Sequence, residues 1–213
     1  MDWDDLNFLD PRIDIRQTEN RLPHWQQNAV VYFVTFHLGD SLPANLLKQL
    51  AHDRNLWLNL HPKPWTPELE AEYHKCFSGA TESWLDAGHG SCLFRQPDCA
   101  AILADALAFF DGDRYDHIAW VVMPNHAHCL FAARPHWPLE KVLQSWKRYS
   151  ARRINEHLGR SGALWHRDYF DRLVRDSHHL SNCIRYIRNN PGKARLGQGE
   201  YLHYENDLAR TVQ

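Results

Sequence analysis

Several stretches of the chain combine β-branched and aromatic residues in a pattern typical of buried strands. The clearest is AVVYFVTF at 29–36, which is closed by Gly39 and Asp40. Three further segments have strand character: 91–94, 115–123 and 126–132. Pro124 and Asn125 join the last two of these segments and mark a turn between them. Residues 164–174 are expected to be extended.

Segments of helical periodicity separate these strands. The strongest pattern covers 139–158, where apolar residues recur at helical spacing and Gly159 follows the last of them. Other helices are predicted over 43–59, 67–86, 98–110 and 177–190. The prolines of an HPKP segment must separate the first two, and Pro191 with Gly192 is expected to end the last.

With the two helices at 43–59 and 67–86 set aside, the order is strand, strand, helix, strand, strand, helix, helix. This order is typical of the α+β class, in which helices pack against an antiparallel sheet. We expect a polar arm without regular structure over 1–27, one domain over 28–200 with a helical insertion near 41–90, and a tail over 201–213.

The composition excludes several classes of protein. The chain has 213 residues, 44% of them hydrophobic and nine of them Trp, which favours a packed core over disorder. No stretch approaches the length of an apolar membrane span, and the acidic N-terminal residues do not resemble a targeting signal. Five cysteines without a Cys-x-x-Cys pair indicate free thiols, so we expect a cytoplasmic protein.

The charge is unevenly distributed along the chain. The formal net charge of −2 argues at first against a nucleic-acid partner. However, residues 141–195 hold 13 Lys and Arg and four acidic residues, a net charge of +9, which leaves −11 for the rest. A basic segment of this kind either faces phosphates or forms ordinary solvated helix faces, and charge alone does not distinguish the two.

Two histidines are the first candidates for chemistry. His126 and His128 lie two apart on a predicted strand, so both imidazoles project to the same side, a spacing that suits two ligands of one metal ion. The alternative is a chance pair in a chain with 15 histidines. Leu130 stands where a histidine-triad hydrolase would need a third histidine, and Cys129 faces the opposite side of the strand.

The last predicted helix carries the second candidate. Leu180, Ile184 and Ile187 form its apolar stripe, whereas Tyr186 and Asn190 lie one turn apart on a neighbouring face. On spacing alone, Tyr186 is equally compatible with a residue at the edge of the stripe whose hydroxyl is in water. Tyr149 lies on the core stripe of the 139–158 helix, so we expect it to pack.

Together, PNHAH on a strand and Y-I-x-x-N-P late in a helix resemble the HUH single-tyrosine transposases, and more narrowly the REP-associated tyrosine transposases. Further resemblance lies in four stretches, at 31–43, 120–131, 145–176 and 186–194. The similarity extends over roughly 24–200. It implies a ferredoxin-like, RRM-like antiparallel sheet flanked by helices, and a metal-dependent endonuclease and strand transferase that acts on single-stranded DNA.

The resemblance also implies roles for individual residues. Tyr186 would be the nucleophile that forms a 5′-phosphotyrosine, and His126 and His128 would hold Mg²⁺ or Mn²⁺ with Asn190 as third ligand. The DNA would carry hairpin-forming palindromic repeats. The protein would act as a monomer or a homodimer. An alternative is a catalytically silent protein that binds hairpins and regulates through its basic segment.

Seven residues of the basic segment are predicted to contact DNA. Four lie largely off the apolar stripe of the 139–158 helix: Lys147, Arg148, Arg152 and Arg153. Three belong to a WHRDYF stretch that interleaves aromatic rings with a cation, as a stacking platform for single strands would: Trp165, Arg167 and Tyr169. For Trp165 the alternative is an ordinary core position.

Overall fold

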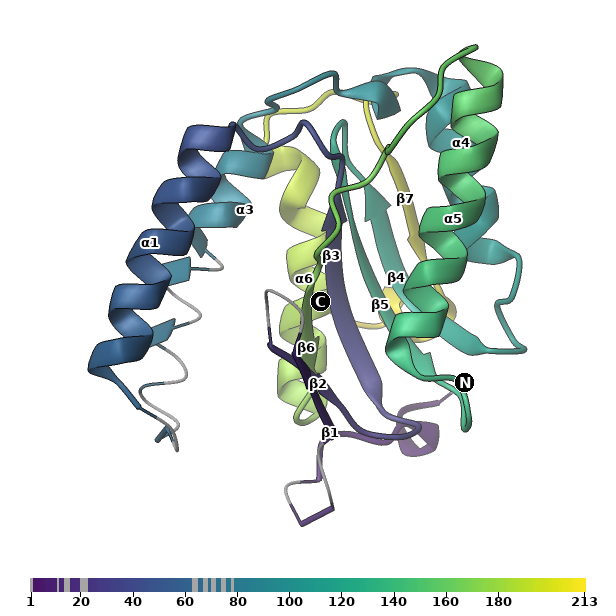
Figure 1. Cartoon of the computed structure of the whole chain (residues 1–213). Coiled ribbons are helices and arrows are strands. Elements are labelled where there is room, and N and C mark those ends of the chain that lie inside the picture. Colours follow the sequence, from purple (N-terminus) through teal and green to yellow (C-terminus); the bar gives the residue numbers. More distant parts are fainter. Residues whose placement is uncertain are drawn as a thin grey trace.

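The computed structural model describes residues 2–10, 12–13, 16–19, 23–62, 65–66, 69, 72–73, 76–77 and 79–213. At its centre is a five-stranded antiparallel sheet in the order β6-β3-β5-β4-β7 (Figure 1). The strands are β3 (Val31–His37), β4 (Tyr115–Val122), β5 (His126–Ala133), β6 (Phe170–Leu173) and β7 (Leu202–Glu205). No helix of the described residues is long and apolar enough to cross a membrane.

Helices cover both faces of this sheet. They are α4 (Pro97–Ala108), α5 (Leu139–His157) and α6 (Ser177–Lys193). The elements β3, α4, β4, β5, α5 and β6 follow the ferredoxin-like βαββαβ order, and β7 extends the sheet beyond β4. The prediction of an α+β fold of this type is therefore confirmed.

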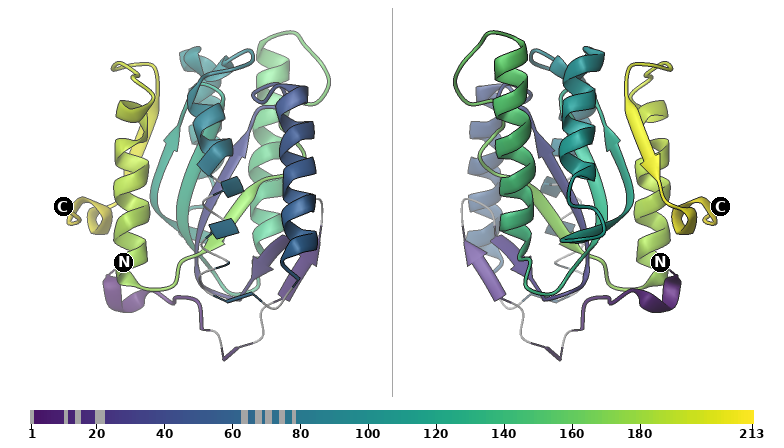
Figure 2. Two further views of the ribbon diagram at one scale, coloured as in Figure 1. Left: turned by 90° about the vertical axis from the view of Figure 1, so that its left-hand side faces the viewer. Right: turned by 90° about the vertical axis from the view of Figure 1, so that its right-hand side faces the viewer.

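Side chains on the two faces of β3 and β5 separate into two cores. Phe36 and Phe131 pack with Trp146 of α5 in one core, whereas Phe33 and Leu130 belong to the other core with Ile184 of α6. Figure 2 shows α5 and α6 on opposite sides of the sheet. Because strand side chains alternate, successive residues of β5 point in turn to one core and then to the other.

The insertion between β3 and α4 is helical, as expected. It contains α1 (Ala44–Leu60) and α3 (Gly79–Asp86), which agree with the helices predicted over 43–59 and at the end of 67–86. Much of 67–78 lies outside the described residues. Leu85 of α3 is buried, so this end of the insertion packs closely on the domain.

Four local predictions are wrong. Residues 91–94 do not form a strand: Cys92 has a left-handed φ of 46°, which no strand accommodates, and a 3-10 helix (Leu93–Arg95) follows. Pro191 does not end α6, because near the last turn a proline removes few helical hydrogen bonds, and the Ala194 amide still donates to the Asn190 carbonyl (3.1 Å).

The other two concern the ends of the chain. The predicted arm contains a short 3-10 helix (Trp3–Asp5) and an antiparallel pair, β1 (Arg16–Glu19) and β2 (Pro23–Gln26). The predicted tail supplies β7, which pairs with β4, and α7 (Asp207–Arg210). These segments lack a repeating apolar pattern, so their structure depends on backbone pairing that residue types do not reveal.

Candidate active site

Two imidazoles on β5 form the centre of the candidate site. The side chains of His126 and His128 are both buried on the sheet face that α6 covers, and their Nε2 atoms are 3.1 Å apart. Ala127 and Cys129 lie in the core of the opposite face. The prediction that the two histidines share one face is therefore confirmed, and so is the placement of Cys129 away from them.

Hydrogen bonds fix which nitrogen of His126 carries the proton. The Asn125 side chain donates from Nδ2 to the His89 carbonyl (3.0 Å), so its Oδ1 accepts from His126 Nδ1 (2.7 Å). The Nε2 atom of His126 then carries a lone pair that points at His128. The Nδ1 atom of His128 is held by the Thr35 hydroxyl on the neighbouring strand β3 (2.7 Å).

Both imidazoles are neutral near pH 7. Burial lowers the pKa of His126 well below its usual value, with a further contribution from His128. Burial also lowers the pKa of His128, to about 3, and the positive charge of Arg172 acts in the same direction. Neutral imidazoles with oriented lone pairs are the form that binds a metal ion.

Asn125 is therefore expected to act as a positioning residue for metal binding. Asn125→Ala removes the acceptor that fixes the His126 tautomer, and we expect the affinity for Mn²⁺ to fall by about 10- to 100-fold. Isothermal titration with Mn²⁺ measures the loss. Asn182→Ala, an exposed amide on α6, is the matched control. An unchanged affinity of Asn125→Ala would show that the tautomer does not depend on this bond.

Tyr186 of α6 lies against the histidine pair. Its ring makes edge contacts with His128 (centroids 5.1 Å apart) and Phe33 (5.6 Å). Burial raises the pKa of its hydroxyl far above the usual value, and the negative charges of Glu82 and Asp86 add to the effect. The helix that carries it begins at an Asp176 cap, whose carboxylate accepts from the His179 amide (2.7 Å).

Asn190 is buried one turn beyond Tyr186. Its side-chain oxygen and nitrogen both lack a hydrogen-bond partner among the residues that the structure describes. A buried carboxamide without hydrogen bonds costs folding free energy. Its oxygen is free to act as a ligand, and hard cations prefer oxygen ligands. His126, His128 and Asn190 offer two imidazole nitrogens and a carboxamide oxygen, the donor types of the predicted ligand set. No three His, Cys, Asp or Glu side chains in the described part of the chain are arranged to hold a metal.

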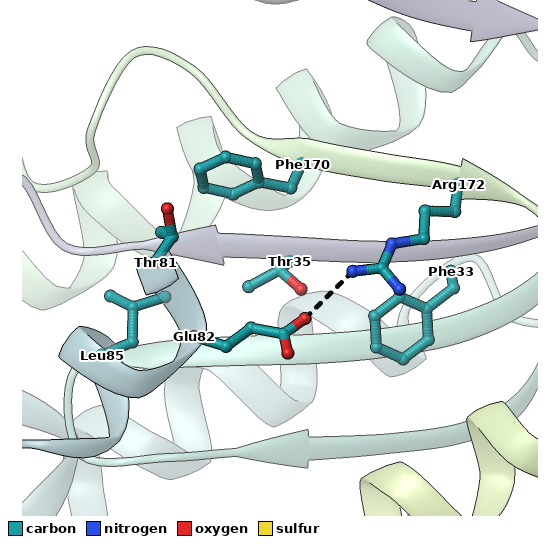
Figure 3. A pocket seen from close by; sticks show the side chains of 7 residues that line it. All are labelled: Phe33, Thr35, Thr81, Glu82, Leu85, Phe170 and Arg172. Carbon is teal, nitrogen blue, oxygen red and sulfur yellow. Dashed lines mark hydrogen bonds and ion pairs between the residues drawn. The ribbon is translucent and has the colours of Figure 1, made fainter. Parts of the chain in front are cut away.

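The insertion adds acidic side chains at this site. Figure 3 shows Glu82 of α3 beside Thr35 and Phe33, with its carboxylate paired to the Arg172 guanidinium (3.2 Å). Asp86, one turn later, has its Oδ1 atom 3.9 Å from His126 Nε2. Burial raises the pKa of this carboxyl to about 6, and the charge of Glu82 contributes.

An open pocket of about 480 Å³ lies between α3 and the end of α6. Tyr186, Lys193 and Arg195 line one side of it, and Glu82 and Asp86 line the other. The Lys193 ammonium is 4.6 Å from the centre of the Tyr186 ring. The tyrosine is therefore accessible from a pocket that has cations available for a phosphate.

The centre of this site lies in a segment that is similar to a known family. Residues 107–190 match the family model of IS200-like transposases, a span that contains His126, His128, Tyr186 and Asn190. This segment is therefore similar to the IS200-like transposases. The insertion helices α1 and α3 lie outside the matched span.

Two solved structures are similar to this chain. The structure of a REP-associated tyrosine transposase bound to a REP hairpin is 14% identical, with a TM-score of 0.40, and the match covers 83% of this chain and 73% of that one. A protein of Deinococcus radiodurans R1, provisionally described as a transposase, is 20% identical with a TM-score of 0.36, covering 76% and 90%. None of the curated proteins matches the chain.

Two of the residues predicted to stack on DNA belong instead to the hydrophobic core of the protein. Trp165 is 8% exposed, lies against Phe36 (4.9 Å between centroids) and donates from Nε1 to the Ser150 hydroxyl (3.0 Å). Tyr169 is 7% exposed in the same core. The structure contradicts their assignment as a stacking platform, because apolar side chains cover their rings.

Part of the positive charge in the basic segment is structural. The Lys147 ammonium donates to the carbonyls of His166 (2.7 Å) and Arg167 (3.0 Å), and burial lowers its pKa to about 8. These bonds tie α5 to the loop that leads to β6 and leave Lys147 poorly placed for a DNA backbone. Arg188 similarly pairs through two nitrogens with Glu205 of β7 (2.8 and 3.0 Å).

The remaining predicted DNA contacts are exposed, but they lie away from the histidines. Arg148, Arg152 and Arg153 are exposed on α5, the helix that covers the other face of the sheet, and Arg167 is exposed on the loop that follows. Tyr149 is 41% exposed among them, so the expectation that it packs in the core is wrong. A DNA that used both surfaces would have to extend around the edge of the sheet.

Proposed function

We propose that the protein is a metal-dependent endonuclease and strand transferase for single-stranded DNA that uses Tyr186 as a covalent nucleophile. The observation that carries the proposal is the meeting of Tyr186 with His126 and His128 in one buried site, although the two motifs are about 60 residues apart in the sequence. The transposase family of residues 107–190 supports the same class of reaction.

In the proposed reaction the Tyr186 hydroxyl oxygen attacks the scissile phosphorus. An O–P bond forms, the bond from phosphorus to the 3′ oxygen breaks, and the tyrosine proton is finally carried by the released 3′ hydroxyl. The products are a 5′-phosphotyrosine and a free 3′ end. Because the phosphodiester is exchanged for another ester, the reverse step can join strands without ATP.

A divalent cation, Mg²⁺ or Mn²⁺, would be held by His126, His128 and Asn190. When bound, it supplies polarisation of the phosphorus and neutralises charge on the phosphate oxygens. The ligand set contains no thiolate, which suits an exchangeable hard cation better than permanent zinc. The unpartnered Asn190 carboxamide supports this assignment.

Two further residues lie where they can accept the proton of the nucleophile or stabilise its negative charge. The Glu82 carboxylate is near enough to Tyr186 to raise the pKa of its hydroxyl, so it is a candidate to take the proton as the tyrosine attacks. Lys193 stands over the same ring and can stabilise the developing phenolate or the phosphate. Tyr186 needs a nearby cation or base to react, because burial and the neighbouring carboxylates both raise the pKa of its hydroxyl.

The substrate that we propose is DNA with imperfect palindromes that fold into hairpins, as the resemblance to REP-associated tyrosine transposases implies. The test is incubation of the protein with Mn²⁺ and a labelled single strand that carries such a hairpin, followed by denaturing electrophoresis. We expect a covalent adduct with the hairpin strand and none with a fully paired duplex. Binding without any adduct would favour the alternative, a catalytically silent hairpin-binding regulator.

The exposed arginines of α5 give a separate prediction. Arg148→Ala, Arg152→Ala and Arg153→Ala together should weaken hairpin binding and reduce its salt dependence by about one unit of slope for each lost phosphate contact. The ion pairs of Arg152 and Arg153 with Glu156 are exposed and weak, so they compete little with DNA. Fluorescence anisotropy at several salt concentrations measures the slope.

The matched control for this triple variant is Arg210→Ala. Arg210 is exposed on α7, paired only with its neighbour Asp207, and carries the same charge. If the salt dependence of hairpin affinity has the same slope in the triple variant and the wild type, α5 is not part of the DNA interface.

A further inference from the structure

Two imidazole nitrogens of β5 and a carboxylate oxygen of α3 converge in the site. The Nε2 atoms of His126 and His128 are 3.1 Å apart, and Asp86 Oδ1 lies 3.9 Å from the first of these. Because Asn125 fixes the proton of His126 on Nδ1, its Nε2 cannot donate to the carboxylate. Asp86 Oδ1 is buried and has no hydrogen-bond partner within the described chain.

We propose that Asp86, supplied by the inserted helix α3, is a further ligand of the divalent cation that His126 and His128 hold. The proposal rests on the cation of the proposed function and adds a carboxylate to its ligands. An octahedral cation about 2.1 Å from its ligands separates neighbouring ligand atoms by about 3 Å. In this structure the two imidazoles and Asp86 are not arranged to hold a metal, and a carboxylate movement of about 1 Å would bring Asp86 to the spacing that the imidazole pair already has.

The other carboxylate of α3 is engaged elsewhere. Glu82 is paired with Arg172, whereas Asp86 Oδ1 lies 3.9 Å from the imidazole of His126. Asn190 is the second unsatisfied group of the site, and it is completely buried. A cation with oxygen ligands would therefore relieve both unsatisfied groups and neutralise the charge of Asp86.

This assignment gives the insertion a role in the chemistry. Helix α3 lies outside the segment that matches the transposase family, yet it would contribute a negative ligand to the centre of that segment. Binding of the cation would also hold α3 against the sheet, so the wall of the pocket beside Tyr186 would depend on the metal.

The test is isothermal titration of the full chain with Mn²⁺, comparing the wild type with Asp86→Asn, His126→Ala and Asp105→Asn. Asp105 is an exposed carboxylate on α4 and gives a control with the same substitution. We expect Asp86→Asn to weaken Mn²⁺ binding by about tenfold or more, His126→Ala to abolish it, and Asp105→Asn to leave it unchanged. Thermal denaturation with and without Mn²⁺ confirms folding and should show a smaller metal-induced stabilisation for Asp86→Asn.

The outcomes separate this inference from the proposed function. If Asp86→Asn binds Mn²⁺ as tightly as the wild type while His126→Ala does not bind, Asp86 is not a ligand and the proposed function stands. If the wild type itself does not bind Mn²⁺, both the Asp86 assignment and the metal dependence are wrong.

Discussion

Tyr186→Phe is expected to reduce formation of the covalent protein–DNA adduct by about a thousandfold or more. The substitution removes the hydroxyl that attacks phosphorus and keeps the ring that packs against His128 and Phe33. Hairpin affinity and thermal stability should therefore change little. The measurement is the yield of adduct from a labelled hairpin strand with Mn²⁺, resolved by denaturing electrophoresis.

Tyr201→Phe is the matched control for this experiment. Tyr201 is also partly buried and packs against the same core as Tyr186. Its variant should form the adduct at the wild-type rate. An adduct that survives in Tyr186→Phe would mean that another side chain is the nucleophile.

His126→Ala and His128→Ala are each expected to abolish both Mn²⁺ binding and strand cleavage. Each variant removes one of the two oriented lone pairs, and one imidazole with a carboxamide holds a divalent cation poorly. Hairpin binding without metal should persist, because the exposed arginines lie on the opposite side of the sheet. Isothermal titration and the adduct assay provide the two readouts on the same protein preparation.

His157→Ala is the control, because His157 is an exposed histidine at the end of α5. It should leave both readouts unchanged. If either variant of the pair cleaves DNA at the wild-type rate with Mn²⁺, the pair is not the metal site.

The local part of the candidate site could be predicted from the sequence. Alternation along a strand placed His126 and His128 on one face, and helical spacing placed Asn190 one turn from Tyr186. Whether these two groups meet depends on the pairing of β3 with β5 and on which face α6 covers. That long-range arrangement was reached through the family resemblance and not through periodicity.

The inserted helix illustrates what the sequence could not reveal. Glu82 and Asp86 are ordinary acidic residues of a short helix, with no motif around them. Their place beside Tyr186 and His126 follows from how the insertion packs, which is a property of the tertiary structure. Asn125 belongs to the PNHAH motif, but the sequence does not show that it orients His126. That role depends on its hydrogen bond to the His89 carbonyl.

Aromatic residues near charges gave the least reliable predictions. Trp165 and Tyr169 stand beside cations in the sequence, yet both are buried, whereas Tyr149 fits the core spacing and is exposed. In each case burial is decided by the neighbouring element: the Phe36 and Phe94 rings enclose Trp165. Amphipathic rings suit either environment, so residue type alone does not decide.

The most direct test of the central claim is to identify the amino acid that becomes linked to DNA. The wild-type protein is reacted with a hairpin strand and Mn²⁺, digested with nuclease and protease, and analysed by tandem mass spectrometry. We predict a nucleotide 5′-phosphate on the peptide that contains Tyr186, with no modified peptide in His126→Ala. A modification on any other residue, or no covalent product with cleavable hairpins, would contradict the proposed mechanism.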